Sequence, residues 1–358
     1  MYRAVRPFLF VLDPERAHEL AAALLKAWTR VAGRPSSRDS VLSRTVFGLR
    51  FPSPIGLAAG MDKGKVLVSA WFRMGFGFVE FGTVTPRPQP GNERPRLFRL
   101  PAKEALINRM GFNNDGAEVV AARLARLGPR PGPVGVNLGR NKATPNERAV
   151  DDYLSAFRTL APRADYVAVN VSSPNTPHLR ALQSAGQLGR LVESLAGERN
   201  ALAAASGRRV PLLVKLSPDE SDGALDAMAD AAVAAGADGF IATNTTLSRE
   251  GVERESRAGE AGGLSGPPLR SRAERTCARL YLRTEGRVPV VGVGGIATAE
   301  DAYRRIRAGA SLIQIYTALV YEGPSLPRRL ERRIAKLLER DGLTLAEATG
   351  KDAERVSR

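Results

Sequence analysis

Short apolar segments recur along the chain and alternate with longer amphipathic ones. The apolar segments are rich in Val, Ile and Leu and lie at 55–59, 78–82, 134–138, 166–171, 212–216, 239–243, 289–293 and 312–316. A strand with one solvated face would alternate apolar and polar residues, whereas these segments are nearly continuous. They therefore predict parallel strands that are buried on both faces.

Helical periodicity occupies the intervals between these predicted strands. The helical segments are 64–75, 114–127, 148–160, 186–205, 220–235, 268–284, 299–308 and 325–340. Eight strand–helix units in one run, with no linker inside 46–340, predict an α/β fold of the (β/α)8 TIM barrel type. A doubly wound parallel sheet is the competing fold, but it does not require eight units in a single run.

The chain extends beyond the predicted barrel at both ends. Residues 1–45 form an N-terminal helical segment, in which 14–32 predicts an amphipathic helix with Leu20, Leu24, Trp28 and Val31 on one face. Residues 341–358 are polar, and we expect a frayed C-terminal tail. The division is an N-terminal helical segment over 1–45, a barrel over 46–340, and this tail.

Three connections that follow predicted strands are long, at 83–113, 172–186 and 244–267. They are rich in Gly, Pro, Asn and Ser, which is typical of loops. In a barrel all three lie at the C-terminal ends of the strands, where active sites form.

Composition narrows the function. The net charge is +16, but only eight of the 53 basic residues are lysines, and the arginines are spread without a nucleic-acid motif. We therefore expect no nucleic-acid partner and favour an anionic membrane surface. One cysteine, Cys277, and two histidines, His18 and His178, exclude a disulfide, an iron–sulfur cluster and a Cys-rich or multi-histidine metal site. No run spans a bilayer, and 8–12 is too short for a signal peptide, so the expected compartment is cytoplasmic.

Polar side chains gather at the predicted strand ends. Two of the scarce lysines, Lys63 and Lys215, lie there. The asparagines there are Asn108, Asn113, Asn137, Asn170, Asn175 and Asn244. Taken singly, each is explained as a turn or surface residue. Their joint placement predicts a planar ligand with amide and carbonyl groups, because asparagine both donates and accepts hydrogen bonds.

The glycines near the seventh strand indicate a phosphate site. GVGGI (292–296) exposes backbone after that strand, and Gly262, Gly263 and Gly266 precede it. Barrels often bind phosphate between the loops after strands seven and eight. The chain lacks a GxGxxG dinucleotide motif after its first strand. With lysines available to face a flavin ring, flavin mononucleotide (FMN) is the cofactor that fits best.

Several motifs resemble the membrane-associated, quinone-using class of dihydroorotate dehydrogenases. They are LDPERAHEL (12–20), GLAAGMDK (56–63), GTVTPRPQPGNERPRLFRL (82–100), INRMGFNN (107–114), NVSSPNT (170–176), ATNTT (242–246), GGLSG (262–266), GVGGI (292–296) and IQIYTAL (313–319). The resemblance implies an FMN enzyme that oxidises (S)-dihydroorotate to orotate, with a membrane quinone as acceptor, in pyrimidine biosynthesis. It further implies a monomer bound peripherally at the cytoplasmic side of the cell membrane.

The resemblance assigns roles residue by residue. Ser173 matches the catalytic base, for which the cytosolic class has cysteine. The substrate positions are Lys63, Asn108, Arg109, Met110, Gly111, Phe112, Asn170, Asn175, Asn244 and Thr245. The flavin positions are Ala59, Gly60, Lys63, Thr83, Asn137, Asn170, Lys215, Thr243, Gly266, Gly295, Tyr316 and Thr317. The quinone region is His18, Arg99 and Tyr316. One departure is the stretch 64–66, which is more basic than the family pattern.

Serine is a poor base at its ordinary pKa and needs help. His178 lies five residues beyond Ser173, and we expect it on the loop surface, so a water-mediated proton exit fits better. One rival is a different FMN barrel oxidoreductase such as a 2-hydroxyacid oxidase, which needs a catalytic histidine. The other is a non-enzymatic basic barrel that binds nucleic acid or membrane, which leaves the strand-end cluster unexplained.

Overall fold

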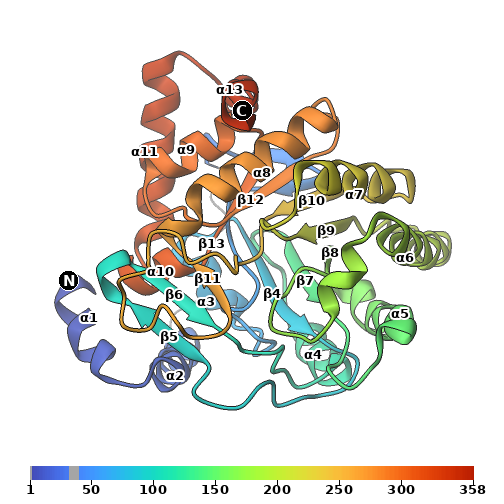
Figure 1. The fold of residues 1–358 in the computed structure, drawn as a ribbon, viewed down its shortest axis with the longest axis horizontal. Helices are drawn as coiled ribbons and strands as arrows, with labels where there is room; N and C mark the ends of the chain where they lie inside the picture. Colours follow the sequence, from blue (N-terminus) through green and yellow to red (C-terminus); the bar gives the residue numbers. More distant parts are fainter. Residues whose placement is uncertain (1, 32–39) are drawn as a thin grey trace.

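Eight parallel strands close into a barrel at the centre of the molecule (Figure 1). The computed structural model describes residues 2–31 and 40–358. In chain order the barrel strands are β3 (Ile55–Leu57), β4 (Phe78–Val84), β7 (Val134–Leu138), β8 (Tyr166–Asn170), β9 (Leu212–Leu216), β10 (Gly239–Ala242), β12 (Val290–Val293) and β13 (Ala310–Ile315). β13 pairs with β3, so the sheet is closed. This confirms the predicted (β/α)8 barrel and excludes the open, doubly wound sheet.

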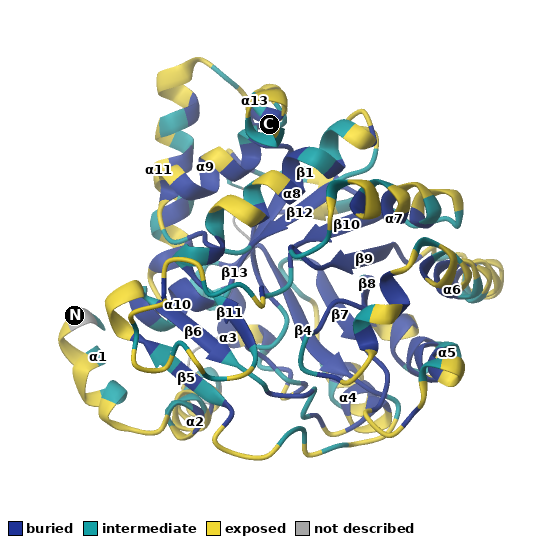
Figure 2. Cartoon of the chain, viewed as in Figure 1, coloured by how far each residue is buried: buried dark blue, intermediate teal, exposed yellow. Residues whose placement is uncertain are grey.

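Helices surround the barrel, and each predicted helix is present within a few residues of its expected bounds. They are α3 (Val68–Met74), α4 (Ala117–Ala125), α5 (Ala149–Leu160), α6 (Ala185–Ser206), α7 (Asp222–Ala234), α8 (Arg270–Arg283), α9 (Ala299–Arg307) and α11 (Leu326–Asp341). A further helix, α10 (Thr317–Glu322), follows β13 directly. Short 3-10 helices span Pro101–Lys103, Asn146–Arg148, Ala161–Arg163, Leu179–Gln183 and Pro267–Leu269. Figure 2 shows the barrel strands buried and the outer helix faces exposed.

One end of the barrel is filled by side chains. Large residues on some strands pack against glycines on their neighbours, since a Cβ at Gly56 would lie 2.2 Å from the Phe78 ring and one at Gly135 would lie 2.1 Å from Tyr166. A hairpin of β1 (Arg44–Val46) and β2 (Leu49–Phe51) adds the ring of Phe51, which meets Phe78 edge to face at 5.1 Å. The filled core leaves the opposite end, at the C-termini of the strands, for a site.

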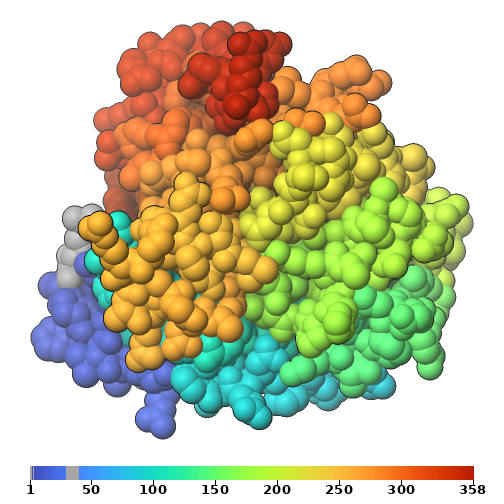
Figure 3. Space-filling view, in the orientation of Figure 1, coloured from blue at the N-terminus to red at the C-terminus, as the bar shows by residue number. Residues whose placement is uncertain are grey.

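Two of the long connections contain strands, which corrects the expectation that they are loops throughout. β5 (Leu97–Leu100) and β6 (Ala105–Asn108) pair within 83–113, and β11 (Gly263–Ser265) from 244–267 pairs with β6. All three are antiparallel, in the order β11-β6-β5. The pairing places the two connections together over the C-terminal end of the barrel, and both lie on the face seen in Figure 3.

Two helices precede the barrel and lie beside β5 and α10 (Figure 1). α2 (Pro14–Val31) confirms the predicted amphipathic helix, while α1 (Tyr2–Val11) was not predicted. Leu20, Leu24 and Trp28 of the predicted apolar face are exposed. Within the described residues, none of the helices combines the length and the hydropathy required to span a membrane.

The C-terminal tail is ordered, so the expectation that it is frayed is wrong. It forms α12 (Leu345–Ala348) and α13 (Ala353–Ser357), and Thr344 and Glu347 make a reciprocal capping box at the start of α12. α13 packs on α8 with Ala353 buried. The Nε of Arg307 donates to Asp352 at 2.6 Å, which fixes the tail to α9. Capping and this ion pair order a segment whose composition is polar.

Candidate active site

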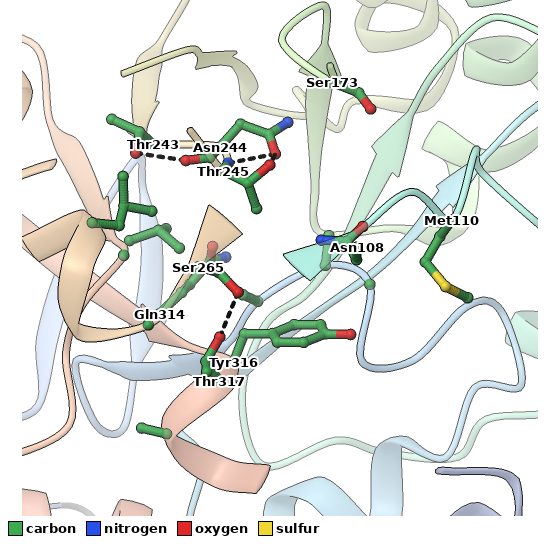
Figure 4. A pocket seen from close by; sticks show the side chains of 18 of the residues that line it. Asn108, Met110, Ser173, Thr243, Asn244, Thr245, Ser265, Gln314, Tyr316 and Thr317 are labelled. Atoms are coloured by element: carbon green, nitrogen blue, oxygen red, sulfur yellow. Dashed lines mark hydrogen bonds between the residues drawn. The ribbon is translucent and has the colours of Figure 1, made fainter. Parts of the chain in front are cut away.

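A pocket of about 1210 Å³ opens at the C-terminal ends of the barrel strands. It gathers residues from all three long connections and from α10 (Figure 4). Nearly every site residue expected from the sequence lines it: Ala59, Gly60, Lys63, Thr83, Asn108, Met110, Gly111, Phe112, Asn170, Ser173, Asn175, Lys215, Thr243, Asn244, Thr245, Gly266, Gly295, Tyr316 and Thr317. In Figure 4, Ser173, Asn108 and Met110 lie on one side, and Thr243, Ser265 and Thr317 on the other.

Two expected residues do not line the pocket. Arg109 is directed away from it, because its Nη1 donates to Glu260 at 2.8 Å and its guanidinium lies 4.6 Å from the centre of the Phe98 ring. Asn137 is fully buried behind the pocket wall. Its Oδ1 accepts hydrogen bonds from Thr83 Oγ1 at 2.6 Å and from Asn170 Nδ2 at 3.1 Å. Asn137 therefore orients two pocket residues from behind.

A carboxylate lies beneath this layer, at a position that sequence reasoning missed. Glu80 is fully buried inside the barrel on β4. It accepts hydrogen bonds from Asn137 Nδ2 at 2.9 Å, Gln314 Nε2 at 2.8 Å and Tyr166 OH at 3.1 Å. Burial, with the nearby Glu80 charge, raises the pKa of Tyr166 well above its ordinary value. Tyr166 therefore stays a neutral donor to Glu80.

The two lysines enter the pocket from opposite parts of the barrel. Lys215 is buried and Lys63 is half-buried, and burial disfavours the charged ammonium form. Burial lowers the pKa of Lys63 to about 8, despite the opposing charge of Glu15. Burial also lowers the pKa of Lys215, while the Glu80 carboxylate acts in the opposite direction. The site thus holds two ammonium groups in surroundings where an anionic ligand gains much from each.

Ser173 lies in the loop that follows β8. It is buried, and its Oγ accepts a hydrogen bond from the N–H of Asn175 at 3.2 Å. Asn175 Nδ2 in turn donates to Asn108 Oδ1 at 3.2 Å, which joins this loop to the end of β6. His178 is exposed, as expected, and the residues lining the pocket include no histidine. The geometry offers Ser173 polar neighbours but no imidazole.

The turn after β12 presents backbone donors to the pocket. In the described part of the chain, the N–H groups of Gly294, Gly295 and Ile296 have no hydrogen-bond acceptor. Behind the turn, the fully buried Arg305 donates to the carbonyls of Val293 at 3.1 Å and Gly294 at 2.9 Å. Arg305 thus holds these carbonyls, and the unpaired N–H groups of a turn that lines the pocket are suited to binding an anion.

A second pocket of about 1460 Å³ lies between α1, α2 and the barrel. Its lining is mostly apolar and includes Leu25, Trp28 and Leu319. The three residues expected in the quinone region, His18, Arg99 and Tyr316, all line it. Tyr316 also lines the first pocket, so the two pockets share a wall.

The polar groups of the second pocket are held in defined states. Burial, with the nearby charges of Lys63 and Lys65, lowers the pKa of His18 to about 3, so its imidazole is neutral at physiological pH. Arg99 Nη1 donates to the carbonyl of Leu12 at 2.8 Å, and its guanidinium lies 4.5 Å from the centre of the Phe10 ring. The pocket therefore combines a mostly apolar lining with the neutral imidazole of His18 and a few charged residues, Asp62, Lys65 and Arg99.

Sequence reasoning missed several residues that shape the site. Glu80 and Gln314 are polar residues inside otherwise apolar strands, FVEFG and LIQIY, and that break in pattern is a signal that could have found them. Ser265, which accepts from Thr317 Oγ1 at 2.8 Å, carries no such signal. Within the described residues, no cluster of three or more His, Cys, Asp or Glu side chains is arranged to hold a metal ion.

Comparisons with known proteins agree with one another. The family model described as "Dihydroorotate dehydrogenase" matches residues 41–338. A protein from Anaeromyxobacter dehalogenans named dihydroorotate dehydrogenase (quinone) is 55% identical over 98% of this chain and 97% of its own length. A protein of the same name from Deinococcus deserti is 51% identical over 99% of this chain and 100% of its own length. A crystal structure of DHODH in complex with ferulenol from Eimeria tenella has a TM-score of 0.88 at 39% identity, over 95% of this chain and 96% of that one.

Proposed function

The chain belongs to the dihydroorotate dehydrogenase (quinone) family of oxidoreductases, and from that membership we propose that it oxidises (S)-dihydroorotate to orotate with FMN and passes the electrons to a quinone. In a cell this reaction serves pyrimidine biosynthesis. The single observation that carries the proposal is the adjacency of two unlike pockets. One is polar and holds lysine, asparagine and serine; the other is apolar; Tyr316 lines both.

The strand-end pocket fits a flavin phosphate and ring. The unpaired N–H groups of Gly294, Gly295 and Ile296 would hold the phosphate. Lys215, Asn170 and the hydroxyl of Thr83 would face the polar edge of the ring. The fully buried Oε1 of Gln314 has no partner in the described part of the chain and would accept a hydrogen bond. When bound, the flavin supplies the hydride acceptor.

Dihydroorotate would lie on the side of the pocket that holds Ser173. The ammonium of Lys63 would pair with the substrate carboxylate, and the amides of Asn108 and Asn175 would hydrogen-bond its ring amides and carbonyls. Ser173 Oγ would accept the carbon-bound proton as its own hydroxyl proton passes to water. The charge that develops on the substrate would be stabilised by the same lysine and amide donors.

The apolar pocket would admit the quinone beside the N-terminal helices. Phe8 and Val11 of α1 are 76% and 86% exposed, and exposed apolar side chains on two adjacent helices suit the surface of a membrane. We place residues 1–45 as the quinone-access and membrane segment, 46–340 as the FMN-binding barrel and 341–358 as its C-terminal extension. The protein would act as a monomer on the cytoplasmic side of the membrane.

The test is the absorption spectrum of the purified protein. A flavin spectrum that is bleached anaerobically by dihydroorotate, with one orotate formed per flavin, is the expected result. L-lactate, a 2-hydroxy acid, should leave the spectrum unchanged. A protein that retains no flavin, or whose flavin is bleached by lactate and not by dihydroorotate, would contradict the proposal.

A further inference from the structure

A buried ion pair joins helix α2 to the start of β5. Glu15 Oε1 accepts from Arg96 Nη2 at 2.6 Å, and Oε2 accepts from Arg96 Nε at 3.1 Å. The side chain of Glu15 is 10% exposed and that of Arg96 is 6% exposed. The exposed side chain of Arg94 also contacts Glu15, with its Nη2 3.1 Å from Glu15 Oε1. The Glu15–Arg96 pair is bidentate and both side chains are buried. Breaking it would leave two unpaired buried charges, so α2 and the start of β5 are held firmly together.

The other side of the Arg96 guanidinium holds a turn of the chain. Its Nη1 donates to the carbonyl oxygens of Pro90 and Asn92, both at 2.7 Å. The turn between them is tightly packed: Gly91 has φ +82°, and a Cβ there would lie 2.3 Å from the carbonyl oxygen of Met110. Arg96 therefore fixes the shape of residues 90–92.

Asn92 connects that turn to the pocket wall. Its Nδ2 donates to the carbonyl of Asn175 at 3.0 Å and to that of Arg109 at 3.0 Å. Its backbone N–H donates to the carbonyl of Met110 at 3.0 Å. Asn175 and Met110 both line the pocket, and the N–H of Asn175 is the group that holds Ser173 Oγ. A continuous set of hydrogen bonds thus runs from α2 to the serine loop.

We propose that Glu15 is a positioning residue for substrate binding, which acts through Arg96 and Asn92 on the wall of the strand-end pocket. This inference rests on the proposed function, since it takes that pocket as the dihydroorotate site. Its consequence is that α2, whose Pro14, Ala17 and His18 line the apolar pocket, also sets the affinity of the other pocket. The N-terminal segment then serves both half-reactions and not the quinone alone.

The test compares Glu15→Gln with Glu19→Gln in the full chain loaded with flavin. Glu19 lies on the same helix and contacts Arg94 at 3.1 Å, but it does not contact Arg96, so it is a matched control. The readout is the dissociation constant of orotate, measured from the change it causes in the flavin spectrum. Glu15→Gln should weaken orotate binding roughly 10-fold, the equivalent of one charged hydrogen bond, while Glu19→Gln should not change it.

Further variants separate positioning from general stability. Glu15→Asp, which keeps the charge, should recover part of the orotate affinity. Asn92→Ala should weaken orotate binding by itself, and its effect should not add to that of Glu15→Gln, because both act along one set of contacts. Asn92→Ala also keeps the inference testable if Glu15→Gln does not fold.

Three results would overturn the inference. One is an unchanged orotate dissociation constant in Glu15→Gln with a lowered melting temperature. Another is an effect confined to the KM for quinone. The third is additivity of the two substitutions. If the unaltered protein itself binds no orotate, it is the proposed function that fails, which distinguishes the two failures.

Discussion

In the proposed reaction, Ser173 would have to accept a proton in a pocket with no histidine in its lining. Its hydroxyl accepts a hydrogen bond from the Asn175 N–H, and Asn108 and Asn244 line the same pocket. Such neighbours do not raise the basicity of serine, but they stabilise negative charge on a bound substrate. In the proposed mechanism Ser173 would therefore pass the proton on to water.

Replacing Ser173 tests this role. Ser173→Ala should retain flavin and bind orotate, while anaerobic reduction by dihydroorotate slows by about 10²–10⁴-fold, the usual contribution of a general base. Ser173→Cys should retain more activity, because a thiolate accepts a proton. Stopped-flow absorbance measures each rate. Reduction of Ser173→Ala at the rate of the unaltered enzyme would remove Ser173 from the chemistry.

Lys63 gives the substrate pocket a pH dependence. Burial lowers its pKa to about 8, so the ammonium is charged below pH 8 and neutral above it. The affinity for the anion orotate should therefore be high near pH 7 and fall as pH rises through 8 and beyond. Orotate titrations at pH 6.5, 7.5 and 9 measure this. Lys63→Met should bind orotate weakly at all three pH values, and its affinity should not change with pH. If the affinity of this variant still falls as pH rises, the pH dependence belongs to another group.

At the scale of elements, the turn after β12 depends on a side chain from α9. Arg305→Met would leave the carbonyl of Gly294 without its donor, while that of Val293 keeps only the N–H of Thr243, so the turn would loosen. We expect FMN to bind about 10-fold more weakly, as for one lost charged hydrogen bond, and riboflavin, which lacks the phosphate, to be little affected. Fluorescence titration of the flavin-free protein measures both. Arg333→Met, on exposed α11, is the control; equal loss of both flavins would contradict a phosphate role.

Helix α1 carries the exposed apolar side chains best placed for a membrane. Phe8→Glu with Val11→Glu should abolish binding to anionic vesicles, because two carboxylates would have to enter the interface. Bleaching by dihydroorotate should be unchanged, since neither residue lines a pocket. Val119→Glu, at an exposed valine of α4, is the matched control. Vesicle co-sedimentation that is equal in all three proteins would show that α1 does not contact the membrane.

The elements that could be predicted are those whose pattern is local. Parallel barrel strands are mostly apolar, so the sequence predicts all eight within two residues of their bounds. β11 pairs with β6, about 155 residues away in sequence, and three residues in a Gly-rich loop carry no periodicity that reveals such a partner. α1 contains Pro7, which argues against a helix. The tail is ordered by the Arg307–Asp352 pair together with burial of the isolated side chains of Leu345, Ala348 and Ala353.

The same distinction applies to the site. Lysines, asparagines and glycines at strand ends could be predicted because the fold gathers strand ends in one place. Arg109 could not be excluded from the sequence, because its direction is set by Glu260, far along the chain. Glu80 was missed because a buried carboxylate inside a strand is understood only when its donors, such as Tyr166 and Asn137, are seen around it.

At the scale of the whole molecule, the two pockets divide one reaction between a polar and an apolar compartment. Tyr316 lies between the two pockets. The hydrogen bonds from Glu15 through Arg96 to Asn92 connect helix α2, beside the apolar pocket, to the wall of the strand-end pocket. In the proposed function, this arrangement would let a water-soluble anion and an apolar acceptor use one flavin without sharing a binding site. The account therefore centres on two separable half-reactions.

The most direct measurement is anaerobic double-mixing stopped flow with Ala22→Trp. Ala22 is buried and lines the apolar pocket, so tryptophan there should fill the space for a quinone. The account predicts that dihydroorotate bleaches the flavin of this variant at the rate of the unaltered protein. A short-tailed quinone should then restore the oxidised flavin spectrum at least 10-fold more slowly than in the unaltered protein. Reoxidation at an unchanged rate, or loss of bleaching together with reoxidation, would contradict the assignment of the two pockets to two half-reactions.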